Sequence, residues 1–195
     1  VTVAVAEVHG TAINPYTVAE ACAAIDNNTG ITGVYTRGIV YSSNSVSSGT
    51  ITYLISDDGT ETNTLQVYRG KGLGNNNFSS VYDVKPGDIV VVYGNLLYYN
   101  NTTYEYNSGN YLTYIKPVIS NESSSNPSEF GYSLQNGGPS AYQTIKVRGR
   151  NLTENLGVTA SEDYEICQTT NGEYSSYLSI TTQNKTAYNI YVRLQ

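Results

Sequence analysis

The chain of 195 residues contains no Met and no Trp, one His, two Cys and only 13% charged residues. One histidine and two widely separated cysteines, Cys22 and Cys167, are too few for a zinc cluster and form no CxxC motif. Long apolar runs are also missing, since no segment approaches the roughly 18 apolar residues of a transmembrane helix. These absences argue against a zinc-dependent, redox-active or membrane-spanning protein.

Positive charge is also scarce, with 10 basic against 16 acidic residues and a formal net charge of −6. Because binding to a phosphate backbone depends on clustered Lys and Arg, this balance argues against a general nucleic-acid-binding protein. The chain is instead rich in uncharged polar residues and in Tyr, of which there are 20. Such a composition is typical of secreted all-β proteins, and we expect an extracellular or bacterial cell-surface location.

No set of catalytic residues stands out in the sequence. His9 has no nucleophile or metal ligand near it in the chain, so neither a Ser-His-Asp triad nor a zinc site is expected. Asp57, Asp58 and Glu61 could meet a calcium ion, but their spacing is not that of an EF-hand and a polar turn is the better interpretation. We therefore expect no enzymatic activity, no cofactor and no bound metal.

The two cysteines leave two alternatives open. A disulfide could join the two halves of the chain or two subunits, which an extracellular setting would permit. Two buried thiols that act as small hydrophobic side chains are the better interpretation.

Period-two apolar patterns, separated by turn residues, predict an all-β fold with one N-terminal helix. Asn14 or Thr17 could cap this helix, and its apolar face comprises Val18, Ala21, Cys22 and Ile25. In the first half of the chain we expect a helical turn over 78–84 and five strands, at 33–42, 50–56, 64–69, 88–98 and 104–115.

Five strands with an element between the third and fourth follow the layout of an OB barrel. Four stretches occur in order: 14–21 (NPYTVAEA), 53–59 (YLISDDG), 65–73 (LQVYRGKGL) and 84–94 (VKPGDIVVVYG). Together they resemble the OB-fold modules of secreted and outer-surface proteins of Gram-negative gut bacteria, a family that is mostly uncharacterised. The resemblance implies an OB-fold domain over 12–116, preceded by an N-terminal strand at 1–11.

The composition changes after residue 116. Residues 117–131 are rich in Pro and Ser, which is typical of a flexible linker. The expected strands that follow are 143–148, 156–160, 164–168, 177–182 and 188–194. The stretches 145–152 (IKVRGRNL), 163–166 (DYEI) and 190–194 (IYVRL) resemble a bacterial Ig-like β-sandwich. The resemblance implies an incomplete sandwich over 132–195, because about seven strands are usual and the final hairpin of the relatives is absent.

Tyrosines are concentrated in the first half of the chain, where an OB barrel would place its ligand cleft. That cleft is formed by the face of the second and third strands and by two flanking loops. Aromatic side chains there could stack on a glycan or on single-stranded nucleic acid. The candidate ligand-binding residues are Tyr53, Tyr68, Arg69, Lys71, Tyr98 and Tyr104. Cross-strand packing and protein contacts are the better interpretation of the tyrosines as a group.

Both ends of the sequence have the alternating apolar pattern of a β-strand. The candidate assembly residues are Val1, Val3, Val5 and Val8 at the start and Ile190, Val192 and Leu194 at the end. We expect the first strand of one subunit to insert into the incomplete sandwich of the next, with main-chain hydrogen bonds for affinity and valines filling the core. Such a heterologous contact, when repeated, produces a filament.

The leading expectation is a non-catalytic extracellular structural or adhesive protein, such as a surface filament subunit. Its partners would be copies of itself or neighbouring domains. The alternative is a ligand-binding accessory module of a larger secreted protein, which recognises a glycan or single-stranded nucleic acid. A third alternative is a fragment of a longer multidomain enzyme whose chemistry lies elsewhere.

Overall fold

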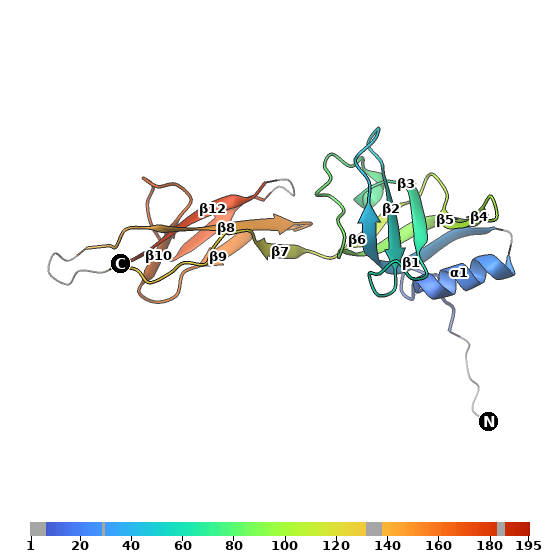
Figure 1. Cartoon of the computed structure of the whole chain (residues 1–195), viewed down its shortest axis with the longest axis horizontal. Helices are drawn as coiled ribbons and strands as arrows, with labels where there is room; N and C mark the ends of the chain where they lie inside the picture. The colour runs from blue at the N-terminus through green and yellow to red at the C-terminus, as the bar shows by residue number, and fades with distance from the viewer. Residues whose placement is uncertain (1–6, 29, 132–137, 183–185) are drawn as a thin grey trace, which may run out of the picture. The chain divides into compact units, whose positions relative to one another are not determined.

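The computed structural model describes residues 7–28, 30–131, 138–182 and 186–195. The chain divides into two compact units, Val1–Lys116 and Pro117–Gln195, called here the barrel unit and the two-sheet unit. Strands dominate both units, and the described residues contain one short α-helix, α1 (Figure 1). The expected all-β class with a single N-terminal helix is therefore confirmed.

The barrel unit is a closed, OB-like barrel of five strands. Its elements are α1 (Val18–Asn27), β1 (Ile31–Ser43), β2 (Ile51–Ser56), β3 (Leu65–Gly70), the 3-10 helix η1 (Leu73–Asn75), β4 (Ile89–Tyr99), β5 (Thr103–Tyr106) and β6 (Tyr111–Ile115). The strands close in the order β1-β2-β3-β5-β4, because β4 pairs again with β1. The barrel is mixed, since β3 and β5 run parallel. Within the expected helical turn over 78–84, a single hydrogen-bonded turn forms, in which the Asp83 N–H donates to the Ser80 carbonyl oxygen (3.1 Å), and η1 lies earlier in the same connection.

The strand expected over 104–115 is two strands, β5 and β6, with a turn between them. Gly109 in this turn has a φ of +96°, a left-handed conformation that glycine adopts without steric cost. The buried side chain of Asn110 donates hydrogen bonds to the carbonyl oxygens of Tyr68 (2.9 Å) and Asn107 (2.8 Å). These bonds fix the turn and tie it to the end of β3.

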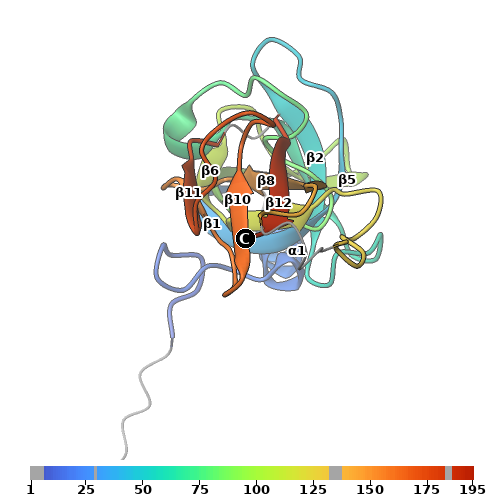
Figure 2. The ribbon, with the colours of Figure 1, turned by 90° about the vertical axis from the view of Figure 1, so that its left-hand side faces the viewer.

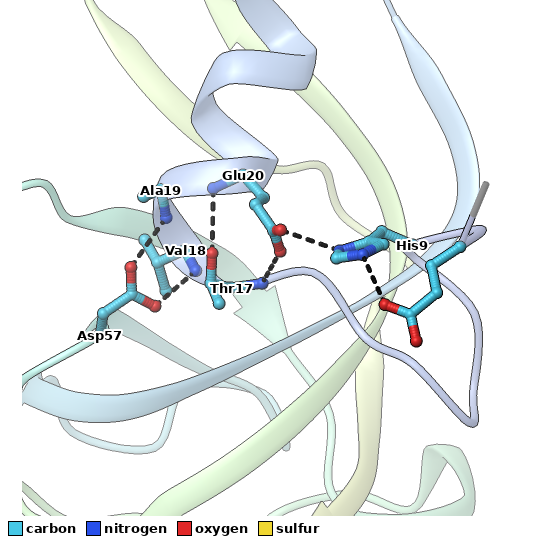
Figure 3. A network of polar contacts seen from close by, with 7 residues as sticks. His9, Thr17, Val18, Ala19, Glu20 and Asp57 are labelled. Carbon is cyan, nitrogen blue, oxygen red and sulfur yellow. Dashed lines mark hydrogen bonds and ion pairs between the residues drawn. The ribbon is translucent and has the colours of Figure 1, made fainter. Parts of the chain in front are cut away.

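Helix α1 begins after Thr17, one of the two caps that the sequence suggested. The Thr17 hydroxyl accepts a hydrogen bond from the Glu20 N–H (3.1 Å), and the Glu20 carboxylate accepts one from the Thr17 N–H (2.8 Å), which is a capping box. Asp57, in the turn after β2, accepts further hydrogen bonds from the N–H groups of Val18 (2.7 Å) and Ala19 (3.0 Å) (Figure 3). Negative charge is favourable at a helix N-terminus. The Asp57 turn is thus a polar turn that caps the helix.

The described residues of the two-sheet unit form six antiparallel strands. They are β7 (Val118–Asn121), β8 (Gln143–Arg150), β9 (Leu156–Thr159), β10 (Tyr164–Cys167), β11 (Tyr177–Ile180) and β12 (Tyr188–Leu194). One sheet has the order β10-β12-β8-β7, and the other pairs β11 with β9. Figure 2 labels β8, β10, β11 and β12 of this unit. The two sheets share an apolar core whose buried members are Leu156, Ile166, Ile180 and Ile190.

The first part of the expected linker, 117–131, is not a linker. Val118–Asn121 forms β7, which pairs with the end of β8. Glu122, the next residue, holds the Arg148 guanidinium through a two-pronged ion pair, with Nε to Oε1 at 2.6 Å and an Nη to Oε2 at 2.9 Å. The short strand forms because it pairs with β8, which is distant in the sequence. The local Pro- and Ser-rich composition does not indicate this pairing.

This ion pair predicts an acid-sensitive contribution to stability. The Arg148 guanidinium lowers the pKa of Glu122 from its ordinary value of 4.5. A carboxylate whose pKa is lowered by folding stabilises the protein above its unfolded pKa, and this contribution is lost as the pH falls through the folded pKa. We therefore expect the free energy of unfolding of the two-sheet unit, measured in urea, to fall on acidification below pH 4.5. In Glu122→Gln it should fall less steeply. The exposed Glu154→Gln variant should keep the wild-type slope, and an unchanged slope in Glu122→Gln would contradict the prediction.

Candidate functional site

An apolar cleft opens beside β9 in the two-sheet unit. Its volume is about 550 Å³, and it is lined by inward-facing side chains from both sheets and by residues 127–130. The side chains that the strands contribute include Ile145 of β8, Val158 of β9, Ile166 of β10 and Val192 of β12. We call this feature the β9 cleft.

The core beneath the β9 cleft is only partly closed. Among the described residues it has 4 buried apolar members, against 17 in the core of the barrel unit. Side chains that alternate toward the core, such as Ile145 and Val147 of β8 and Val158 of β9, remain partly exposed. This exposure leaves apolar surface that an added element could bury.

The free edge of β9 borders the cleft. Within the described residues β9 pairs with β11 alone. Natural edge strands are usually protected by a charged residue, a proline or a bulge, and the sequence Leu-Gly-Val-Thr of β9 contains no charge and no proline. A second cleft of about 200 Å³ adjoins the first half of β9 and includes Ile119 of β7, which is 62% exposed. An additional strand would find both backbone partners and apolar surface here.

The last strand has neighbouring strands on both sides. β12, which carries Ile190, Val192 and Leu194, pairs with β10 on one side and β8 on the other, so it is a central strand without an open edge. Ile190 is fully buried in its own core, and Val192 lines the β9 cleft. The edge strand that borders the apolar cleft is β9, which the sequence did not indicate as a site.

The start of the chain is only partly described. Val1, Val3 and Val5 lie outside the described residues. Val8 is 71% exposed and belongs to no strand.

His9 has a partner that the sequence did not indicate. Its Nδ1 lies 2.8 Å from the Glu20 carboxylate, which also caps α1 (Figure 3). The carbonyl oxygen of the next residue, Gly10, accepts a hydrogen bond from the Tyr35 N–H of β1 (3.0 Å). His9 and Gly10 are thus attached to the helix N-terminus and to β1.

A different, polar cleft lies on the barrel unit. Its volume is about 370 Å³, and it is lined by Asn44, Ser45, Ser47, Thr50, Thr52, Tyr68 and Arg69. Arg69 has a left-handed backbone, with φ +48°, and its N–H donates to the Thr52 hydroxyl (3.0 Å). We call this feature the polar cleft. It combines hydroxyl and amide groups, one aromatic ring and one guanidinium, and no carboxylate lines it.

Two of the six predicted ligand residues, Tyr68 and Arg69, therefore lie together. Tyr53 does not belong to the site: it is 1% exposed and packs in the barrel core, because it shares the inward face of β2 with Ile51 and Ile55. The backbone of Lys71 forms an isolated β-bridge with Tyr111 of β6, and Lys71 does not line the polar cleft.

Tyr98 and Tyr104 pack on each other on the β4-β5 hairpin. Their rings are stacked with centroids 4.8 Å apart. The Tyr104 hydroxyl donates to the Asp26 carboxylate (2.7 Å), and this bond is the main cause that raises the pKa of Tyr104 to about 12. This pair fits the cross-strand packing that the sequence also suggested.

The two cysteines are free. Burial, with smaller effects of Asp26 and Asp57, raises the pKa of Cys22 to about 11, so that it is a neutral thiol at physiological pH. Cys167 is buried in the two-sheet unit. Both side chains fit the interpretation as small hydrophobic residues.

In the described ranges no group of three or more His, Cys, Asp or Glu side chains is placed to hold a metal ion. No helix within the described part of the chain has the length and hydrophobicity to span a bilayer. Comparisons with protein-family models, with curated proteins and with solved structures found no match. The β9 cleft and the polar cleft are therefore the features from which a function is inferred.

Proposed function

We propose that this chain is a non-catalytic structural or adhesive protein of the cell surface or extracellular space, whose two-sheet unit accepts a β-strand from a second copy. The observation that carries the proposal is the free edge of β9, a strand without charge or proline, beside an apolar cleft of about 550 Å³. Strand addition at such an edge gains affinity from main-chain hydrogen bonds and specificity from alternate side chains that enter pockets.

Residues 1–8 of the second copy are the proposed donor. Val1, Val3 and Val5 alternate with Thr2, Ala4 and Ala6, and the first charge is Glu7. In an extended strand the three valines point to one side. That side matches the apolar wall of the β9 cleft, while the small residues of the other side suit a solvent-facing surface.

The contact would join different surfaces of the two copies, because the donor is the first segment of the barrel unit and the acceptor lies in the two-sheet unit. A heterologous contact of this kind leaves one donor and one acceptor free at the ends of each oligomer, so it propagates into a filament unless it closes on itself. The resemblance to OB-fold modules and Ig-like domains of secreted and outer-surface bacterial proteins supports a surface location.

The experiment is to remove residues 1–6, which leaves His9 and its contact with Glu20 in place. We expect the full chain to form concentration-dependent oligomers by light scattering and short filaments by electron microscopy, and the truncated chain to be monomeric. Val3→Asp with Val5→Asp should abolish assembly. Thr2→Asp with Ala4→Asp, on the other side of the strand, is the matched control and should assemble. Oligomers that persist unchanged after truncation would overturn the proposal.

The polar cleft favours a second candidate function, the binding of a glycan. Its hydroxyl and amide groups, the Tyr68 ring and the Arg69 guanidinium are the groups that hydrogen-bond and stack on sugars. Arg69 is the single basic residue that lines the polar cleft, and the chain has a net charge of −6. These charges do not favour the binding of a polyanion.

Glycan arrays on the truncated monomer test this candidate. Tyr68→Ala should lower the affinity of a bound glycan about tenfold, the effect of a lost stacking contact of 1–3 kcal/mol. Tyr114→Ala, which removes an exposed tyrosine outside the polar cleft, should not. Binding that weakens steeply with salt would point to nucleic acid instead.

A further inference from the structure

Residues 127–130, called here the strap, form one wall of the β9 cleft without belonging to any strand. The side-chain amide of Gln143, the first residue of β8, holds the strap. It accepts a hydrogen bond from the Ser128 N–H (2.8 Å) and donates to the carbonyl oxygens of Ser128 (3.1 Å) and Glu129 (3.3 Å). A ring contact between Phe130 and Tyr164, with centroids 5.4 Å apart, is the second attachment.

The position of Gln143 explains why the strap borders the cleft. Side chains two residues apart in a strand point to the same face, so Gln143 faces the same way as Ile145, which lines the cleft. Its amide both accepts from and donates to Ser128, as the backbone of a paired strand would. The strap is therefore held where a peptide segment would lie if it entered the cleft.

We propose that the strap is a displaceable cover of the β9 cleft, which must leave before a strand from a second copy can be fully seated. This inference rests on the proposed strand acceptance and adds its regulation. The strap is exposed at Pro127, Ser128 and Glu129, and one side chain and one ring hold it. A seated strand would replace these attachments with main-chain hydrogen bonds and buried valines.

The test uses the chain without residues 1–6 and a synthetic peptide of residues 1–8 (VTVAVAEV), called here the donor peptide. Gln143→Ala should bind the donor peptide about tenfold more tightly than the parent, which corresponds to about 1.4 kcal/mol. Hydrogen exchange of the Ser128 amide should become faster in the same variant, because its acceptor is removed. Gln168→Ala, at an exposed glutamine of the same unit, is the matched control and should change neither quantity.

Phe130→Ala provides a second variant that leaves β8 intact, and it should also tighten binding. If the parent and both strap variants bind the donor peptide with equal affinity, the strap is not a cover and the inference is overturned, while strand acceptance stands. If none of the three binds the donor peptide, strand acceptance itself fails, and the regulatory role of the strap fails with it. Faster Ser128 exchange in Gln143→Ala with tighter binding supports the inference.

Discussion

Replacing Tyr53 by Ala is expected to lower the free energy of unfolding of the barrel unit by about 3–5 kcal/mol, the range for large aromatic side chains removed from a core. Tyr53 is fully enclosed, and the phenol contributes to the packing between β2, Gly70 and the turn at Asn110. Such a loss is a large fraction of the stability of a typical domain. Chemical denaturation followed by circular dichroism will measure it.

Tyr68→Ala is the matched control for this prediction. Tyr68 points away from the core and is 39% exposed, so its removal should change stability by less than about 0.5 kcal/mol. Equal losses for the two variants would contradict the placement of Tyr53 in the core and of Tyr68 at the surface.

Val158→Lys is expected to abolish acceptance of the donor peptide, with a loss of affinity of at least about 100-fold, or 2.7 kcal/mol. Val158 lies on β9 and lines the cleft. A seated strand would have to bury the introduced ammonium group against valines, and burying an unpaired charge is strongly unfavourable. Because Val158 is only partly buried without a partner strand, the lysine can reach solvent in the free protein and the unit should still fold.

Thr144→Lys introduces the same charge on the exposed face of β8 and should bind the donor peptide as the parent does. Isothermal titration calorimetry measures both variants. Unimpaired binding by Val158→Lys would show that the donor peptide does not use the β9 cleft.

Local patterns in the sequence were sufficient for most strands and for the helix. Thr17 and Glu20 have the spacing of a capping box, and their side chains form it. The same alternation distinguishes the buried Tyr53 from the exposed Tyr68. Tyr53 is in phase with the apolar Ile51 and Ile55, whereas Tyr68 is out of phase with Leu65 and Val67. That signal was present in the sequence and was not used.

Long-range pairing could not be predicted in this way. β7 has four residues in a Pro- and Ser-rich segment and is a strand only because the end of β8 lies beside it. The central position of β12 and the free edge of β9 depend on the order of strands in the sheets, which no local period encodes. The β9 cleft was missed for this reason, although an incomplete sandwich was expected.

Hydrogen exchange with the donor peptide tests strand acceptance most directly. With the chain that lacks residues 1–6, saturating donor peptide is expected to slow exchange of backbone amides along Leu156–Thr159, since strand addition to β9 pairs this edge. The same experiment on Val158→Lys should show no added protection. Protection confined to other strands, or none at saturating peptide, would contradict the proposal that β9 accepts a strand.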